Sequence, residues 1–350
     1  MPEIKEAELK RQIEKSDFAH LYFLYGEEKY LVEYYARKLI TKAGGKDPSD
    51  FNLQKFCGTN AGIDAVAAAV EALPVFAERK CVAVSDLDIN ALHGAEAGKL
   101  WQLFNDLPDT CVLVIYLPTL VFDEKRDKNW KKFLSKANAV GNIVPIRRRS
   151  TAQLVRMMRS AADKRGCMLS EKNATQMLSL CGSDLSTAVN EIEKLCAYTG
   201  SGEITAQAVE LLTAKNLEAR VFDLSKAILA GNSDRAYAVL EQLFNQNEEP
   251  VAVLSVLAGA YLDLYRVKVS LQSGFSALEP AKYFDYARKE FRLTNAEYSA
   301  KHFSVPMLRQ SLRVLLKTDL QLKSARGNRK LALEKLIAEL IWIVEKEKMN

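Results

Sequence analysis

Short apolar runs alternate with helical patterns through residues 1–146, and this alternation limits the fold more than any other feature of the sequence. Runs with the composition of β-strands are Leu21–Tyr25, Phe51–Cys57, Cys81–Val84, Cys111–Tyr116 and Asn142–Ile146. Apolar residues at helical spacing mark the segments between them: Leu31–Lys42, Ile63–Leu73, Leu100–Leu107 and Trp130–Ala137. Strands that alternate with helices of about a dozen residues form parallel βαβ units. The sequence predicts an α/β domain, and its largely apolar strands indicate a sheet covered on both faces.

Strand signals stop after the junction Arg147–Ser150, and the rest of the chain has helical patterns. Residues 151–215 hold three or four helical stripes, with Ser183 and Thr205 as candidate N-caps. A region of about 65 residues has the size of a lid rather than of an independent domain. Further helices follow and end in a long pair, residues 305–324 and 329–348. We expect three domains: α/β at 1–146, a helical lid at 147–215 and an all-helical domain at 216–350.

The composition is that of a soluble globular protein, with 48% apolar and 27% charged residues among 350. The longest apolar runs, such as Cys111–Pro118, are far too short to span a bilayer. The charged N-terminus lacks the apolar core of a signal peptide. We therefore expect a cytoplasmic protein that does not enter a membrane. A net charge of +5 permits an acidic partner but does not demand one.

Cysteine and histidine spacing argues against a metal site. The six cysteines contain no C-x-x-C pair, and the three histidines have no Cys or carboxylate partner at ligand spacing. We expect neither a zinc site nor a disulfide framework.

The first strand leads into a turn that resembles a nucleotide site without its phosphate ligands. A P-loop has the pattern G-x-x-x-x-G-K-[ST]. Here Gly26 is followed by Glu27, Glu28 and Lys29, with no second glycine and no Lys-Ser/Thr pair. The two glutamates would repel a triphosphate. These four residues are therefore predicted to form a degenerate nucleotide site, and no cofactor is expected.

Two acids follow the third predicted strand, where an ATPase would carry its metal-binding acids. Asp86 and Asp88 are either ligands of a metal ion or members of a solvated loop at the end of the strand. Two nearby acids supply few ligands alone, which favours the solvated loop.

The order of these patterns resembles the delta subunits of bacterial DNA polymerase III clamp loaders. The similar stretches are LYFLYGEEKYLVE, LPVFAERKCVAV, GSDLSTAVNEIEKL, ITAQAVELL, RVFDLSKAILAGNSDRAYAVLEQL, LLKTDLQLKS and LALEKLI. They follow the family order from residue 21 to residue 337. The resemblance implies an AAA+-like, RecA-type parallel-sheet domain that has lost its ATP site, a small helical lid domain and an all-α collar domain for oligomerisation.

The same resemblance assigns clamp binding to the stretch LPVFAERK. In delta subunits the pair that corresponds to Val75 and Phe76 enters an apolar pocket of the sliding clamp, here with Leu73 and Pro74 in support. From the residues alone, an apolar pair between a helix and a strand is more often core; the resemblance reverses that preference. Val75 is smaller than the leucine often found there, so Phe76 is the stronger candidate.

The resemblance also implies partners. They are the sliding clamp (the beta subunit), loader subunits of the gamma/tau and delta-prime types, and primer–template DNA within the complex. The chain would have no catalytic site and would serve a holoenzyme with DNA-directed DNA polymerase (nucleotidyltransferase) activity. A basic set near the end of the chain either contacts DNA or is an ordinary solvated loop: Lys323, Arg326, Arg329 and Lys330. Trp101, Trp130 and Trp342 are expected in the core.

Two alternatives from other classes stay open at this point. A divergent P-loop NTPase would require a G-K-[ST] after the first strand, which is absent. A DNA-binding regulator would be expected to carry a helix-turn-helix or a strongly basic face. The sequence shows neither a clear helix-turn-helix pattern nor a strongly basic face.

Overall fold

The computed structural model describes residues 3–45, 48–58, 62–286, 290–324 and 328–349. The chain separates into two compact units, residues 1–149 and 150–350. Each unit is described by itself below.

The first unit is built on one parallel five-stranded sheet with the strand order β2-β3-β4-β1-β5. The strands are β1 (Leu21–Gly26), β2 (Leu53–Cys57), β3 (Lys80–Ser85), β4 (Cys111–Tyr116) and β5 (Asn142–Ile146). The five predicted strands are thus confirmed, with shifts of one or two residues at some ends. Parallel neighbours have the register Leu21↔Leu113 and Tyr22↔Asn142 on the two sides of β1.

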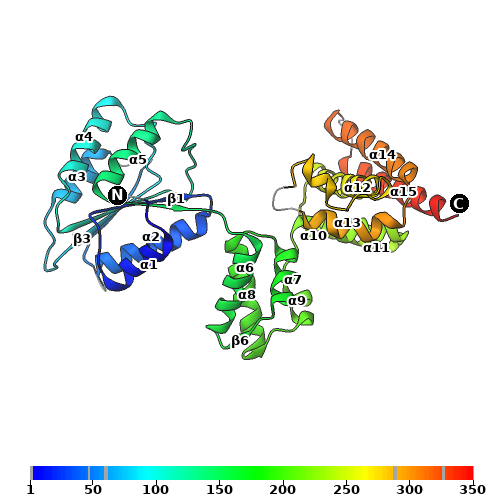
Figure 1. Cartoon of the computed structure of the whole chain (residues 1–350), viewed down its shortest axis with the longest axis horizontal. Coiled ribbons are helices and arrows are strands. Elements are labelled where there is room, and N and C mark those ends of the chain that lie inside the picture. Colours follow the sequence, from blue (N-terminus) through cyan, green and yellow to red (C-terminus); the bar gives the residue numbers. More distant parts are fainter. Residues whose placement is uncertain (1–2, 46–47, 59–61, 287–289, 325–327, 350) are drawn as a thin grey trace. The chain divides into compact units, whose positions relative to one another are not determined.

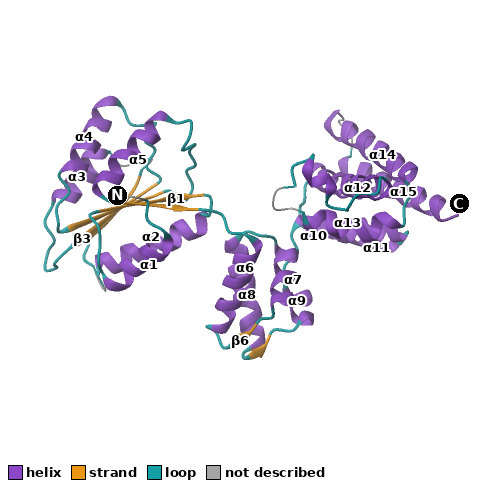
Figure 2. Ribbon diagram, in the orientation of Figure 1, coloured by secondary structure: helices purple, strands orange, loops and turns teal. Residues whose placement is uncertain are grey.

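Helices cover both faces of this sheet (Figure 2). They are α1 (Glu6–Lys15), α2 (Lys29–Gly44), α3 (Ile63–Glu71), α4 (Gly94–Asn105) and α5 (Lys128–Val140). Figure 1 shows α1 and α2 on one face, and α3, α4 and α5 on the other. The connection from β1 to β2 crosses the sheet in one direction and the later connections return, so right-handed crossovers place α2 opposite the other three helices. The predicted α/β domain is confirmed.

Aromatic side chains fill the core between the sheet and α5. Phe122 stacks on Trp130 with ring centroids 4.0 Å apart, and Phe23 meets Phe133 edge-on at 4.8 Å. Trp130 is almost fully buried, as predicted. Offset and edge-on pairs of this kind add to the free energy of burial.

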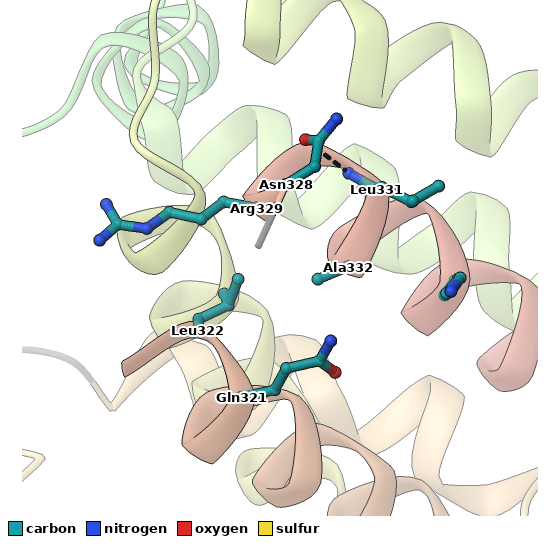
Figure 3. Close-up of a pocket in the computed structure, with 7 residues that line it drawn as sticks. Gln321, Leu322, Asn328, Arg329, Leu331 and Ala332 are labelled. Atoms are coloured by element: carbon teal, nitrogen blue, oxygen red, sulfur yellow. Dashed lines mark hydrogen bonds between the residues drawn. The ribbon is translucent and has the colours of Figure 1, made fainter. Parts of the chain in front are cut away.

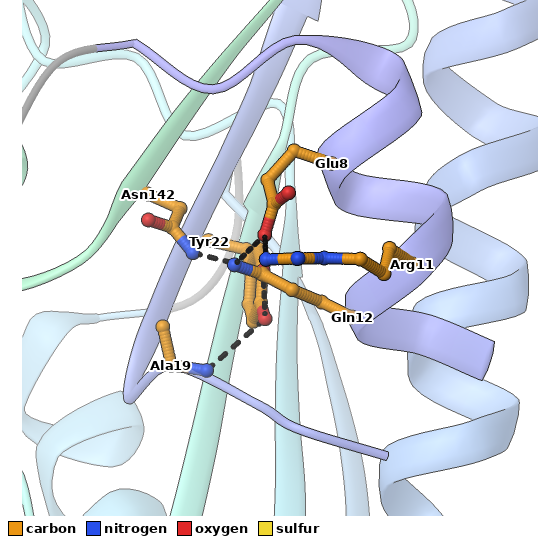
Figure 4. A network of polar contacts seen from close by, with 6 residues as sticks. All are labelled: Glu8, Arg11, Gln12, Ala19, Tyr22 and Asn142. Atoms are coloured by element: carbon orange, nitrogen blue, oxygen red, sulfur yellow. Dashed lines mark hydrogen bonds and ion pairs between the residues drawn. The ribbon is translucent and has the colours of Figure 1, made fainter. Parts of the chain in front are cut away.

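Helix α1 is an element that the sequence analysis did not predict, and a polar network joins it to β1 (Figure 4). The Tyr22 hydroxyl donates to Gln12 Oε1 at 2.8 Å and accepts from the Ala19 N–H at 3.0 Å. The Asn142 side chain donates to the same Gln12 oxygen at 3.0 Å. Burial raises the pKa of Tyr22. Gln12 thereby joins α1 to the neighbouring strands β1 and β5.

The second unit begins with four helices and one short pair of strands. The helices are α6 (Thr151–Asp163), α7 (Glu171–Cys181), α8 (Leu185–Thr199) and α9 (Ala206–Leu212). The strands β6 (Cys167–Met168) and β7 (Gly202–Glu203) pair in parallel, so the prediction that strands stop after the junction was wrong. Strands of two residues are too short to show an alternating pattern.

The caps of these helices follow the expected chemistry with one correction. Thr205 caps α9 by accepting a hydrogen bond from the Ala208 N–H at 3.2 Å, which confirms the prediction. The cap of α8 is Asp184 rather than Ser183. The Asp184 carboxylate accepts from both the N–H and the hydroxyl of Thr187 at 2.8 Å. Ser and Asp are both good caps, so the sequence alone did not separate two adjacent candidates.

The rest of the unit is helical around a core that α12 crosses. Its elements are α10 (Leu217–Ala230), α11 (Ser233–Asn245), α12 (Pro250–Gln272), η1 (Glu279–Lys282), α13 (Phe291–Lys301), α14 (Val305–Ser324) and α15 (Arg329–Met349). Helix α12 is long and apolar enough to cross a membrane by length and composition, a feature that the sequence did not predict. Its buried residues, such as Leu257 and Tyr261, instead belong to the core of these helices. The division of this unit into a lid and a collar stays a prediction.

Candidate functional site

The carboxyl edge of the sheet beside β1 is where ligands bind in open α/β folds. Gly26 ends β1 with φ +142°, and a Cβ there would lie 2.0 Å from the Ile146 carbonyl oxygen of β5. The Glu28 N–H donates to that same oxygen at 3.4 Å. Glu28 is buried as the residue before α2, and Glu27 is exposed. Contact with β5, with no ligand involved, is enough to require glycine at this turn.

Lys29 and Asp86 both hold the loop that follows β4. The Lys29 ammonium donates to the carbonyl oxygens of Leu117 and Leu120 at 3.0 and 2.5 Å. Asp86 accepts from the N–H groups of Thr119 and Leu120 at 3.0 and 2.8 Å, and from the Thr119 hydroxyl at 2.9 Å. Burial lowers the pKa of Lys29, and nearby Asp86 opposes this shift.

Asp86 lies, as predicted, in the loop at the end of β3 and is partly exposed, but its carboxylate is bonded to the loop after β4. Its oxygens are used by three donors of the same loop. Asp88 accepts from the Asn90 N–H at 2.9 Å within its own turn. Within the described residues there is no group of three or more His, Cys, Asp or Glu side chains arranged to hold a metal ion.

An exposed apolar tip lies between α3 and β3. Helix α3 ends at Glu71, two residues before Leu73, and residues 72–79 connect it to the sheet. Leu73 is 77% exposed and Val75 41%, whereas the Phe76 ring is fully exposed. Phe76 also has φ +51°, a left-handed conformation that few residues other than glycine adopt. The core interpretation of the Val75–Phe76 pair is therefore wrong, and an apolar tip remains on the surface.

Asn52 holds this tip, and the sequence analysis did not identify it. The Asn52 side-chain N–H donates to the Val75 carbonyl oxygen at 2.7 Å, and the Val75 N–H donates to Asn52 Oδ1 at 2.8 Å. Asn52 lies directly before β2 and is only 6% exposed. The sequence analysis placed Asn52 inside the predicted strand Phe51–Cys57, where an asparagine gives no sign of a contact with a distant loop.

One residue of the basic set near the end of the chain, Arg329, lies at a small pocket between α14 and α15 (Figure 3). The pocket holds about 220 Å³, less than the 300–1,000 Å³ typical of a ligand site. Arg329 lines it, whereas Lys323 pairs with Asp319 at 2.7 Å and Lys330 lies 5.1 Å from the Phe244 ring centroid. Arg326 lies outside the described residues. DNA contact by this set stays a prediction.

The other two tryptophans are less buried than expected. Trp101 is half-buried, with the ammonium groups of Lys132 and Lys136 at 5.8 and 5.6 Å from its ring centroid. Trp342 is 56% exposed on α15, so its prediction as a core residue was wrong. Helical spacing alone does not give the direction in which an aromatic residue on a terminal helix points.

Two family models match the chain in the order that the sequence stretches suggested. A model of the DNA polymerase III delta subunit matches residues 22–142, and a model of the C-terminal domain of the same subunit matches residues 218–340. The chain belongs to the DNA polymerase III delta subunit family.

Curated relatives of the delta family extend over almost the whole chain. The delta subunit of Bacillus subtilis is 24% identical over 345 residues, which cover 96% of this chain and 97% of the relative. The delta subunit of Escherichia coli is 25% identical over 311 residues and covers 87% of each chain. A solved structure, a DNA clamp loader delta protein of Bacillus subtilis, covers 96% of this chain and 99% of its own length, with a TM-score of 0.57 and 22% identity. It supports the fold of this delta-family chain.

Proposed function

We propose that this chain is a non-catalytic subunit of the DNA polymerase III clamp loader that binds and opens the sliding clamp for loading onto primed DNA. The observation that carries this proposal is the exposed tip in a delta-family chain: Phe76 stands fully in solvent on the surface of the first unit. An aromatic ring held in that way is costly unless a partner covers it. Apolar side chains of this size gain about 1.5–3 kcal/mol each on burial, enough for a small hot spot.

The tip acts as a wedge in this proposal. Phe76 enters an apolar pocket of the clamp, with Val75 beside it and with Leu73 and Pro74 in support. Binding energy at this site favours a clamp conformation whose ring interface no longer closes well. Because Val75 is only partly exposed, its contribution is smaller than that of Phe76.

The loader around this subunit supplies the ATP chemistry. In this chain, the carboxyl edge of the sheet is occupied by Lys29, Asp86 and the loop that they hold. This arrangement supports the proposal that the subunit binds no nucleotide. ATP binding by the gamma/tau subunits then exposes the tip, and hydrolysis releases the clamp on DNA. The helices of residues 216–350 join the subunits, including one of the delta-prime type, into a cytoplasmic hetero-pentamer. The basic set that includes Lys323, Arg329 and Lys330 is the candidate contact with primer–template DNA.

A divergent P-loop NTPase is the weaker alternative. It would need a free lysine near the β1 turn, and the Lys29 ammonium is instead bonded to two carbonyl oxygens. The third class, a DNA-binding regulator, gains no support from the exposed apolar tip.

Substitution of Phe76 tests the proposal. We expect Phe76→Ala to lower affinity for a bacterial sliding clamp roughly 30- to 1,000-fold, because removal of a central aromatic anchor costs about 2–4 kcal/mol. The melting temperature should hardly change, because the ring makes little contact with the rest of the chain. A calorimetric titration of clamp with the full chain measures the affinity.

The matched control is Phe275→Ala, which removes a ring that is also exposed but lies in the second unit. This variant should bind the clamp like the unmodified chain. Normal clamp binding by Phe76→Ala would place the binding surface elsewhere, and a large drop in melting temperature would return Phe76 to a structural role.

A further inference from the structure

We propose that Asn52 is a positioning residue for clamp binding, because its side-chain amide holds the backbone of Val75 and so presents Phe76 to the partner. This inference rests on the proposed function of the tip. It adds a residue that contacts the tip from a different part of the chain and makes no contact with the clamp itself.

The side-chain amide of Asn52 forms hydrogen bonds with both backbone polar groups of Val75, as the backbone of a paired strand does. One side chain accepts from the Val75 N–H and donates to the Val75 carbonyl oxygen, at 2.8 and 2.7 Å. Both bonds fall on the residue directly before Phe76. Asn52 is itself buried, and a buried amide that uses both its oxygen and its N–H on one partner fixes that partner in two directions.

Asn52 is in turn fixed to the sheet. Its N–H donates to the Ser49 carbonyl oxygen at 2.9 Å, and its own carbonyl oxygen accepts from the Cys81 N–H at 2.8 Å. Cys81 is fully buried in β3. Asn52 therefore fixes the position of the tip relative to the sheet, at the start of the edge strand β2.

The tip needs such a support because its ends are anchored but its centre projects outward. At one end, the Ala72 N–H donates a hydrogen bond to the Ala68 carbonyl oxygen in the last turn of α3. At the other end, the Lys80 N–H donates to the Thr110 carbonyl oxygen. Between these two points the Asn52 bonds hold the backbone just before Phe76. The left-handed conformation of Phe76 is one that an aromatic residue adopts only when its surroundings impose it. A tip held in its bound conformation avoids the entropy loss of ordering a mobile loop on binding.

Asn52→Leu is the main test, because leucine has a similar size and removes both bonds. The freed Val75 groups can be hydrated, since Val75 is already partly exposed, so the fold should persist. The first readout needs no partner: hydrogen exchange at the Val75 amide of the full chain. We expect protection at Val75 in the unmodified chain and at least about tenfold faster exchange in the variant, because one hydrogen bond that shielded this N–H is lost. Equal exchange rates would overturn the proposal.

The second readout is a double-mutant cycle with a bacterial sliding clamp. Asn52→Leu should weaken binding roughly 5- to 50-fold, in line with the net value of two hydrogen bonds. The double variant Asn52→Leu/Phe76→Ala should bind within about twofold of Phe76→Ala alone, because residues that act through one contact are not additive. Asn105→Ala, which removes an exposed amide on α4, is the matched control and should bind normally.

The outcomes separate the two proposals. If Phe76→Ala weakens binding but Asn52→Leu does not, or if the two losses add in full, the role of Asn52 is wrong and the proposed function stands. If Phe76→Ala binds normally, the proposed function of the tip fails, and the positioning role fails with it. Should Asn52→Leu not fold, Asn52→Asp replaces it: the acceptor remains, but the donor to the Val75 carbonyl oxygen is lost, and the same faster exchange and non-additive loss are expected.

Discussion

At the scale of single residues, backbone and side-chain contacts within the chain fill the region that is predicted to be a degenerate nucleotide site. The Gly26 turn is closed by Ile146, the Glu28 N–H is bonded to that residue, and Lys29 is bonded to two carbonyl oxygens. A phosphate would have to displace these contacts, and Glu27 and Glu28 would repel it. We therefore expect no heat of binding when the chain is titrated calorimetrically with Mg-ATP up to millimolar concentration. Saturable binding in the micromolar range would contradict the assignment of a degenerate site.

Asp86 is the residue in this region whose loss should destabilise the fold. Asp86→Ala removes one acceptor that serves three donors of the loop after β4. Hydrogen bonds to a charged group contribute more than neutral ones, so we expect a loss of about 2–4 kcal/mol in the free energy of unfolding. Chemical denaturation of the full chain measures it.

The neighbouring acid supplies the comparison. Asp88→Ala removes the acceptor of a local bond to Asn90 and should cost less than about 1 kcal/mol, since such turn contacts are weak. Equal losses for the two variants would mean that the loop does not depend on Asp86.

At the scale of elements, what the sequence predicted depended on how strong and how local each signal was. The five strands are largely apolar and bounded by turns, so their ranges were nearly correct, and the helix Val305–Ser324 was correct at both ends. Helix α1 was missed because it is short and polar, with only Leu9 and Ile13 buried. The tip was found through a resemblance, whereas Asn52 was missed because its contact joins residues 23 positions apart.

An ion pair with a buried carboxylate lies among the helices around α12. Asp263 lies inside this apolar helix and accepts from Arg292 Nε at 2.8 Å and from the Tyr286 hydroxyl at 2.5 Å. Burial and the nearby Asp263 raise the pKa of Tyr286, while Arg266, which donates to its hydroxyl, lowers it. Asp263 thereby joins α12 to Arg292 of α13 and to Tyr286 in the segment before α13.

Asp263→Ala should destabilise the chain strongly. The change leaves the Arg292 guanidinium without its carboxylate and takes the acceptor from Tyr286. Because the Arg292 side chain is 32% exposed, we expect a loss of about 2–3 kcal/mol, less than the cost of breaking a fully buried pair. Thermal or urea unfolding gives the value. Asp234→Ala, at an exposed position in the first turn of α11, should change stability by less than about 1 kcal/mol. A small effect at Asp263 would show that apolar packing alone holds these helices.

At the scale of the whole molecule, the proposed functions fall in different units of the chain. The tip, Asn52 and the predicted degenerate site belong to residues 1–149. In the second unit, the described residues from Val221 to Val344 contribute to a helical core. Lys215 stands before that core and pairs with Glu210 of α9 and Asp223 of α10, at 2.8 and 3.0 Å. A chain that ends at Lys215 keeps the tip and loses the helices proposed for assembly, so it separates clamp binding from assembly.

A shortened chain of residues 1–215 should bind the sliding clamp with the affinity of the full chain, because every residue assigned to the tip and its support is retained. It should fail to join the other loader subunits, because the helices proposed to assemble the complex are gone. Size-exclusion chromatography of the mixed subunits measures assembly, and calorimetry measures clamp binding; a melting curve checks that the first unit is folded. The full-length Phe76→Ala variant is the converse control, since it should assemble but not bind the clamp. Co-elution of the shortened chain with the loader would show that assembly does not depend on residues 216–350, and the collar assignment would then be wrong.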